Sequence, residues 1–351
     1  MSNSVSRRQF LGTSATVAAG IVAASQVSVQ NHSANAAFAQ TDGTTSSNFK
    51  TQIFKAAIVG EPDDKKFESL VNAGFEGVET TAWNTTPEKA ATGRLLAEKH
   101  GLRIHSVMRG WANFNADDKV VRQKTIDETA TALRAAAAYG ADTILLVPCK
   151  IGSFDQADWI PTPQEFKIAF DPKTLKVNKV ADGDSAKFEK YIQQQNIATE
   201  TSIEAVNSLI PLAAELGVVI GIENVWNNLW VKPEFFAAFV RSFDNIWVRT
   251  YLDLGNHAKY APPEEWVATC GTTIIKTHCK DFLVDSESKD GGSVRNFRRL
   301  YEGNINWSTV RRALDAVNYN GWMSDETGAA QDSELIRRMN AIIAGEQLKI
   351  G

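Results

Sequence analysis

The sequence of 351 residues predicts an α/β protein with a single (β/α)8 barrel domain, and three observations lead to this fold. Short apolar runs rich in β-branched residues occur eight times and alternate with longer stretches of helical period. The chain is 43% apolar and 22% charged, so it has enough apolar residues for a large core. The first run ends at Val59-Gly60-Glu61 without a G-x-G-x-x-G motif, which disfavours the open, doubly wound sheet of a dinucleotide-binding protein.

The eight predicted strands are short and apolar, and they cover residues 53–59, 77–81, 104–108, 143–148, 218–224, 247–256, 273–281 and 321–326. The predicted helices follow them in turn, at residues 63–73, 87–100, 117–139, 197–216, 233–241, 263–270, 307–317 and 332–344. Several of these helices are expected to end at a glycine, namely Gly74, Gly101, Gly140 and Gly217. The loop after the fourth strand, residues 150–187, is unusually long and is expected to contain a hairpin around Asp171-Pro172-Lys173.

The N-terminal segment has the layout of an export signal. Ser6-Arg7-Arg8-Gln9-Phe10-Leu11 precedes a weakly apolar run at residues 15–24, and small-x-small sites follow at residues 34–36 and 37–39. The arginine pair resembles the twin-arginine type, which predicts the twin-arginine export machinery as a partner and a bacterial periplasmic location. The apolar run is too short for a stable membrane anchor. We therefore expect a signal at residues 1–39, a polar linker at 40–50 and the barrel domain at 51–351.

The charge balance and the cysteines exclude several classes of protein. Lys+Arg 37 against Asp+Glu 41 gives a net charge of −4, without the basic patch that a nucleic-acid-binding protein needs. Cys149, Cys270 and Cys279 are too few and too scattered for a disulfide framework or a C-x-x-C zinc site. We expect them to be buried or idle thiols.

Four residues of metal-ligand type stand at the ends of the last four predicted strands. They are Glu223, Asp253, His278 and Glu326. In a barrel the strand ends of one side meet at the active-site face, so these side chains are expected to converge. Three converging carboxylates need a counter-ion, and one divalent cation would supply it. The oxygen-rich set with one imidazole favours Mn²⁺ or Co²⁺, with Zn²⁺ or Mg²⁺ as alternatives.

Residues 53–345 resemble the sugar isomerase/epimerase superfamily of xylose-isomerase-like TIM barrels. The motifs that carry the resemblance are IGIEN (220–224), YLDLGN (251–256), KTHCKDF (276–282), YEGNINW (301–307) and YNGWMSDE (319–326). The superfamily includes ketose 3-epimerases, hydroxypyruvate isomerase, inosose dehydratases and the endonuclease IV branch. The resemblance implies a metal held by Glu223, Asp253, His278 and Glu326, with the two glutamates acting as acid and base on opposite faces of the substrate.

This chemistry agrees with the residue types. Removing a proton from a carbon next to a carbonyl needs a base and an electrophile, and a carboxylate and a metal ion provide them. We therefore expect a divalent-metal-dependent isomerase or epimerase of a sugar, keto-sugar or polyol, with Glu223 and Glu326 catalytic. The alternatives are an inosose-type dehydratase or lyase, and a non-catalytic barrel that binds metal or carbohydrate. An endonuclease with three metal ions is disfavoured, because the chain has only five histidines. A homo-oligomer is compatible with the sequence.

The sequence departs from the ketose 3-epimerases around the substrate. Where those enzymes have a histidine three residues after the aspartate ligand, this chain has Asn256, with His257 one residue later. Those enzymes have an arginine six residues after the histidine ligand, where this chain has Val284. They also have a glutamate six residues after the first glutamate ligand, where this chain has Leu229. The carbohydrate substrate therefore stays open.

Further residues are candidates for substrate binding at the barrel mouth. Glu79, at the end of the second strand, is expected either to bind sugar hydroxyls or to pair with a lysine or arginine. Lys280 shares a strand face with His278 and is expected to hold a substrate oxygen or to pair with Asp281 or a neighbouring glutamate. Asn256 and His257 belong to the same candidate set. Trp111 and Trp226 follow strand ends, where they would stack on a sugar or pack under loops.

Overall fold

The protein is described by a computed structural model that covers residues 49–152, 158–183, 185–288 and 290–349. The predicted signal and all of the predicted linker except Phe49 and Lys50 lie outside the described residues. Within the described residues, no helix combines the length and the apolar composition that crossing a membrane would require.

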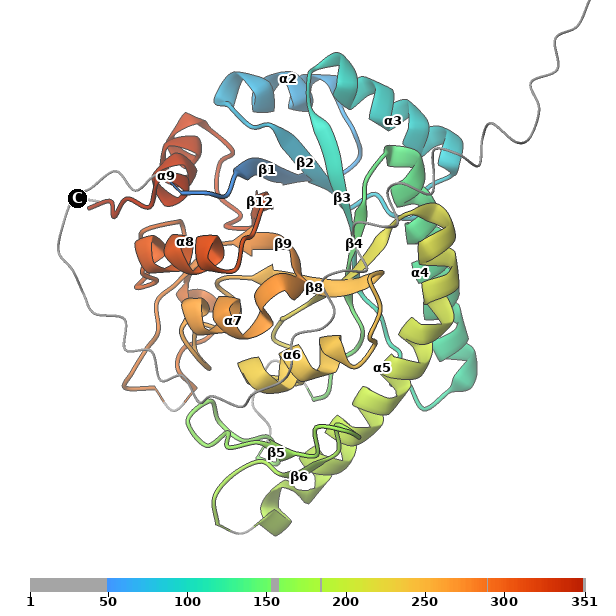
Figure 1. Ribbon diagram of the computed structural model, residues 1–351, viewed down its shortest axis with the longest axis vertical. Coiled ribbons are helices and arrows are strands. Elements are labelled where there is room, and N and C mark those ends of the chain that lie inside the picture. Colours follow the sequence, from blue (N-terminus) through green and yellow to red (C-terminus); the bar gives the residue numbers. More distant parts are fainter. Residues whose placement is uncertain (1–48, 153–157, 184, 289, 350–351) are drawn as a thin grey trace, which may run out of the picture. The chain divides into compact units, whose positions relative to one another are not determined.

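Eight parallel strands form a closed barrel, which confirms the predicted fold (Figure 1). The strands are β1 (Ile53–Val59), β2 (Gly77–Thr80), β3 (Arg103–Trp111), β4 (Thr143–Val147), β7 (Val219–Glu223), β8 (Val248–Asp253), β9 (Ile274–Cys279) and β12 (Gly321–Asp325). Each predicted strand coincides with an observed one and differs from it only at the ends. Around the barrel β7, β8, β9 and β12 are consecutive neighbours, so the four predicted ligands come from one side.

Helices surround the strands on the outside of the barrel (Figure 1). They are α2 (Asp64–Ala73), α3 (Pro87–Lys99), α4 (Lys119–Tyr139), α5 (Glu189–Leu216), α6 (Pro233–Arg241), α7 (Pro263–Cys270), α8 (Trp307–Ala316) and α9 (Ser333–Ala344). The glycines predicted at helix ends all have a positive φ, a backbone conformation that a residue with a Cβ rarely takes. This confirms them as residues that end helices. Their φ values are 107° at Gly74, 72° at Gly101, 73° at Gly140 and 67° at Gly217.

Helix α5 begins at Glu189 rather than at the predicted Ile197, so that boundary was wrong. The first two turns carry polar residues without an apolar stripe, and their stability comes from tertiary contacts. Tyr191 is fully buried and donates a hydrogen bond to the Asn228 carbonyl at 2.7 Å, while Gln195 is buried beside it. Tertiary packing therefore extends a helix that local periodicity did not predict.

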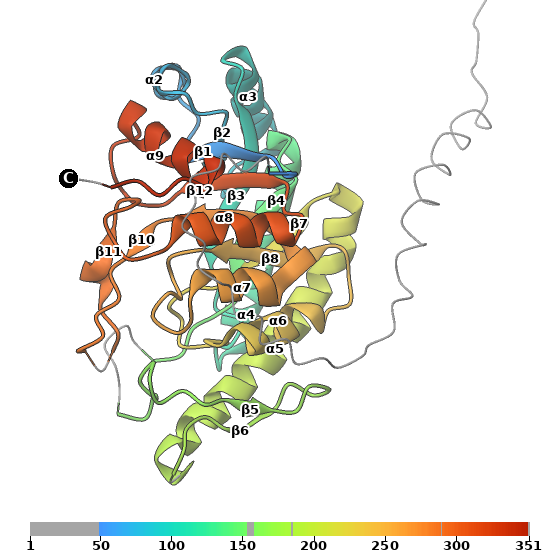
Figure 2. The same cartoon turned by 60° about the vertical axis from the view of Figure 1, so that its left-hand side comes forward.

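Two short antiparallel pairs stand outside the barrel sheet. The predicted hairpin is confirmed as β5 (Ala169–Phe170) with β6 (Val177–Lys179), which lies along the first half of α5. A second pair, β10 (Asp281–Phe282) with β11 (Phe297–Arg298), was not predicted. Figure 2 shows this second pair at one end of the barrel, directly after β9 in the chain.

Candidate metal centre

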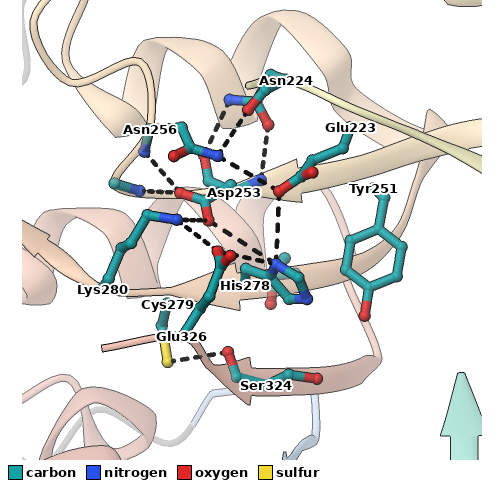
Figure 3. Close-up of polar contacts among 12 residues, drawn as sticks. Glu223, Asn224, Tyr251, Asp253, Asn256, His278, Cys279, Lys280, Ser324 and Glu326 are labelled. Atoms are coloured by element: carbon teal, nitrogen blue, oxygen red, sulfur yellow. Dashed lines mark hydrogen bonds and ion pairs between the residues drawn. The ribbon is translucent and has the colours of Figure 1, made fainter. Parts of the chain in front are cut away.

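The four predicted ligands meet at the carboxyl ends of β7, β8, β9 and β12 (Figure 3). Glu223 and Asp253 are the last residues of their strands, and Glu326 directly follows β12. Asp253 lies next to His278 in the ladder between β8 and β9, because the parallel register aligns these two positions. One ligand atom from each of the four side chains lies within 4.8 Å of the others.

The Nδ1 atom of His278 points at all three carboxylates. It lies 3.2 Å from Glu326 Oε2, 3.5 Å from Glu223 Oε1 and 3.8 Å from Asp253 Oδ2. This nitrogen is buried and makes no hydrogen bond to any residue that the structure describes. A buried imidazole nitrogen without a hydrogen bond, surrounded by carboxylate oxygens, fits the donor set of a divalent cation.

The other imidazole nitrogen of His278 is held by Glu79. His278 Nε2 lies 2.6 Å from Glu79 Oε2, and the same oxygen accepts a hydrogen bond from the Tyr251 hydroxyl at 2.9 Å. Ser106 donates to the second Glu79 oxygen at 3.0 Å. Burial disfavours the charged imidazolium, but the surrounding carboxylates, Glu79 first, outweigh burial and raise the pKa of His278. When the imidazole is neutral, a carboxylate that accepts the Nε2 proton fixes the tautomer in which Nδ1 has a free lone pair for a metal. Glu79 is fully buried behind His278 and supports this ligand, in place of the contacts expected from the sequence.

Asp253 is fixed by backbone groups on its far side. Its Oδ1 accepts the N–H groups of Gly255 at 2.7 Å and Asn256 at 2.6 Å, which leaves Oδ2 facing the centre. Asn224 receives the Asp253 N–H at 2.7 Å and returns a bond to the Asp253 carbonyl at 2.9 Å. The Asn256 amide lies 3.3 Å from Glu223 Oε1, so this residue orients a ligand.

Lys280 is the positively charged neighbour of the centre. Its Nζ donates to Asp253 Oδ2 at 2.8 Å and also to Glu326 Oε2. The pairing with Glu326 agrees with the expected neighbouring glutamate, while the aspartate partner is Asp253 rather than Asp281. Burial disfavours the ammonium form, but the two carboxylates outweigh burial and raise the pKa of Lys280.

The pKa values of the two glutamates differ in direction. Burial raises the pKa of Glu223 to about 7, although the neighbouring His278 opposes the shift. Burial acts in the same direction on Glu326, but Lys280 and His278 hold its pKa well below the usual value. Glu326 is also the most exposed of the four side chains, at 33% against 6% or less for the others. It is therefore the ligand that a molecule entering the barrel mouth can reach.

Two of the remaining substrate-binding candidates, His257 and Trp111, have their own local contacts. His257 is buried, with Nε2 2.9 Å from the Val225 carbonyl and its ring against Tyr260 and Trp266. This packing agrees with a structural role. Trp111 is 41% exposed, and its ring lies 5.8 Å from the Lys150 ammonium.

Trp226 belongs to an aromatic cluster beside the centre. Its ring lies 5.0 Å from Phe297 and 5.6 Å from Phe282, residues of the β10–β11 pair. The Trp226 indole N–H donates to the Asn256 carbonyl, and the Lys259 ammonium lies 3.6 Å above the ring. Trp226 thus connects the loop after β7 to the unpredicted pair after β9.

Asp281 anchors this unpredicted pair, and sequence reasoning missed its role. The fully buried carboxylate accepts hydrogen bonds from backbone and indole N–H groups, namely Phe282 N at 2.8 Å, Tyr301 N at 2.8 Å, Ile305 N at 3.2 Å and Trp307 Nε1 at 2.8 Å. The only available signal was a charged residue within the apolar end of a strand. Tyr251 was also missed, although its spacing of two from Asp253 places both on the inner strand face.

Comparisons with known proteins agree with the barrel fold. Residues 67–342 match the family model described as xylose isomerase-like TIM barrel. An uncharacterized protein of Methanocaldococcus jannaschii is 25% identical over 140 residues, which are 38% of this chain and 45% of that protein. The match therefore spans less than half the length of this curated relative.

Solved structures share the fold. A D-tagatose 3-epimerase-like protein superposes with a TM-score of 0.60 at 16% identity, covering 83% of this chain and 97% of that one. The 3-keto-D-glucoside 4-epimerase of E. coli gives 0.57 at 14% identity, with 84% and 99% covered. Mannonate dehydratase of Streptococcus suis gives 0.59 at 12% identity, with 86% and 98% covered.

Proposed function

Because the chain belongs to the family of xylose isomerase-like TIM barrels, we propose that it is a divalent-metal-dependent isomerase or epimerase of a sugar, keto-sugar or polyol. The observation that carries the proposal is the placement of two glutamates on the outer members of four adjacent strands. Glu223 comes from β7 and Glu326 from the end of β12, with Asp253 and His278 between them. A substrate bound over the centre would meet one carboxylate on each side.

The residues have defined roles in the proposed reaction. Glu223, Asp253, His278 and Glu326 would hold a divalent ion, which would supply positive charge to a substrate carbonyl oxygen. One glutamate takes the proton from the neighbouring carbon, and the electron pair of the broken C–H bond moves into the carbonyl group. The other glutamate donates a proton to the opposite face, which inverts that carbon. Return of the proton to the adjacent carbon gives isomerisation instead. The glutamate proton exchanges with solvent between turnovers.

The test separates metal binding from proton transfer. Glu326→Gln and Glu223→Gln keep a carbonyl oxygen for the ion but lose the basicity that moves a proton. We expect turnover to fall by roughly 10² to 10⁴ in each variant, while part of the metal affinity remains. The measurement is solvent-deuterium incorporation and product formation with added Mn²⁺ on a panel of ketoses and inososes. Glu302→Gln, which pairs with Arg338 outside the centre, is the control.

The outcomes distinguish the candidate activities. Loss of water from the substrate in place of inversion would favour the dehydratase alternative. If both variants turn over like the unaltered protein, the glutamates only hold metal and the proton-transfer proposal is wrong. Elemental analysis should find about one divalent ion per chain in the unaltered protein and none in His278→Ala.

We also propose that the protein is exported through the twin-arginine route. The support is the order of parts in residues 1–39, where Arg7-Arg8 precedes an apolar run and small-x-small sites.

A further inference from the structure

We propose that Lys280 is a second, built-in cation of the centre, which shares Asp253 and Glu326 with the metal and weakens metal binding. This inference rests on the proposed metal-dependent function and deepens it. Lys280 was expected from the sequence only as a substrate contact or an ion-pair partner.

Lys280 touches the two oxygens that face the centre. Asp253 Oδ1 is occupied by backbone N–H groups, so Oδ2 is the oxygen that faces His278, and Lys280 Nζ lies 2.8 Å from it. The Glu326 oxygen that lies 3.2 Å from His278 Nδ1 is likewise the one that accepts from Lys280. Ammonium and metal therefore draw on the same two oxygens (Figure 3).

The backbone fixes Lys280 in this position. A Cβ on Gly255 would lie 2.4 Å from the Lys280 carbonyl oxygen and 2.7 Å from Lys280 Cγ, so only glycine lets the two segments approach. The Phe297 ring lies 5.1 Å from Nζ on another side. The side chain is 8% exposed, which leaves the ammonium little freedom to turn toward water.

The charges support a role in addition to packing. Three carboxylates with a neutral imidazole and a divalent ion leave one negative charge in a buried site, and the Lys280 ammonium neutralises it. The same ammonium repels the metal ion and competes for its ligand oxygens. Removing it therefore strengthens metal binding.

The experiment compares the two buried lysines on either side of His278. Lys280→Met removes the ammonium at the centre, and Lys276→Met removes one within β9, where Nζ pairs with Asp142 at 2.7 Å. Mn²⁺ binding to chelator-treated protein is measured by calorimetry. We expect at least about tenfold tighter binding in Lys280→Met, unchanged affinity in Lys276→Met and near-normal affinity in Lys280→Arg.

The results separate this inference from the proposed function. Tighter Mn²⁺ binding in Lys280→Met together with unchanged binding in Lys276→Met supports the role of Lys280, since lost packing alone would weaken metal binding. If the unaltered protein binds Mn²⁺ and Lys280→Met binds it equally or more weakly, this inference fails while the proposed function stands. If the unaltered protein binds no divalent ion, both fail.

Discussion

Replacing Glu79 tests whether the carboxylate behind His278 prepares the centre for a metal. Glu79 is fully buried and accepts hydrogen bonds from Ser106, Tyr251 and His278. Glu79→Gln keeps the shape and can still accept the His278 and Tyr251 bonds with its carbonyl oxygen. It loses the negative charge that makes the imidazole a stronger ligand.

The structure sets the expected size of the effect. Loss of a partner carboxylate behind a histidine ligand costs roughly 10- to 100-fold in metal affinity, and we expect the lower end for Glu79→Gln. Glu79→Ala removes all three acceptor contacts and leaves buried donors on Tyr251 and His278. Each unsatisfied buried donor costs about 1–3 kcal/mol, so this variant should also lose several kcal/mol of unfolding free energy.

The assay is Mn²⁺ calorimetry together with urea unfolding of the metal-free protein. Tyr251→Phe is the matched control, because it removes one hydrogen bond to the Glu79 carboxylate and keeps the hydrogen bond between Glu79 and His278. That variant should lose about 1 kcal/mol of stability and keep its metal affinity. Unaltered metal affinity in both Glu79 variants would refute the idea that this carboxylate orients the histidine ligand.

Three further predictions concern other parts of the chain. Asp281→Asn should lower the unfolding free energy by about 2–4 kcal/mol in urea titrations, because an amide nitrogen cannot accept the N–H groups that one carboxylate oxygen now receives; a loss below 1 kcal/mol would contradict the anchoring role. Burial lowers the pKa of His257 to about 3 from an ordinary value near 6.5. As the pH falls below 6.5, His257 takes up a proton in the unfolded chain but not in the folded one, so the free energy of unfolding decreases. Between pH 7.5 and 5 the loss from this residue is about 2 kcal/mol, and His257→Asn should show a correspondingly shallower pH dependence in urea unfolding. Replacing both Arg7 and Arg8 by lysine should leave an unprocessed precursor in the cytoplasm on immunoblots of cell fractions, and a mature-sized product outside would argue for another route.

The barrel and the grouping of the four ligands could be predicted because both follow from local patterns. Strands alternate with helices, and residues at the ends of neighbouring parallel strands must come together. The four predicted ligands lie at the carboxyl ends of such strands, so their convergence could be predicted without any information on side-chain contacts. They are Glu223, Asp253, His278 and Glu326.

The supporting contacts could not be predicted, because they join distant segments. Glu79 reaches His278 across 199 positions of sequence, and nothing near Glu79 marks that partner. Asp281 accepts hydrogen bonds from N–H groups of residues 282–307. The path of that segment depends on β10 and β11, which have only two residues each. Lys280 had several plausible partners on its strand face, and only the closeness of Gly255 fixes its position. The catalytic roles of the two glutamates stay predictions until turnover is measured.

The hydrogen bonds of Asp281 close a loop in the chain. Phe282 at one end and Tyr301 at the other are bound to the same carboxylate, three residues after His278. The segment between them contributes Phe297 to the aromatic cluster but none of the four predicted metal ligands. Its two ends are therefore held at one point, independently of the length of the segment between them. Under the proposed function, we expect grafted segments of other lengths to alter substrate preference without displacing the four ligands.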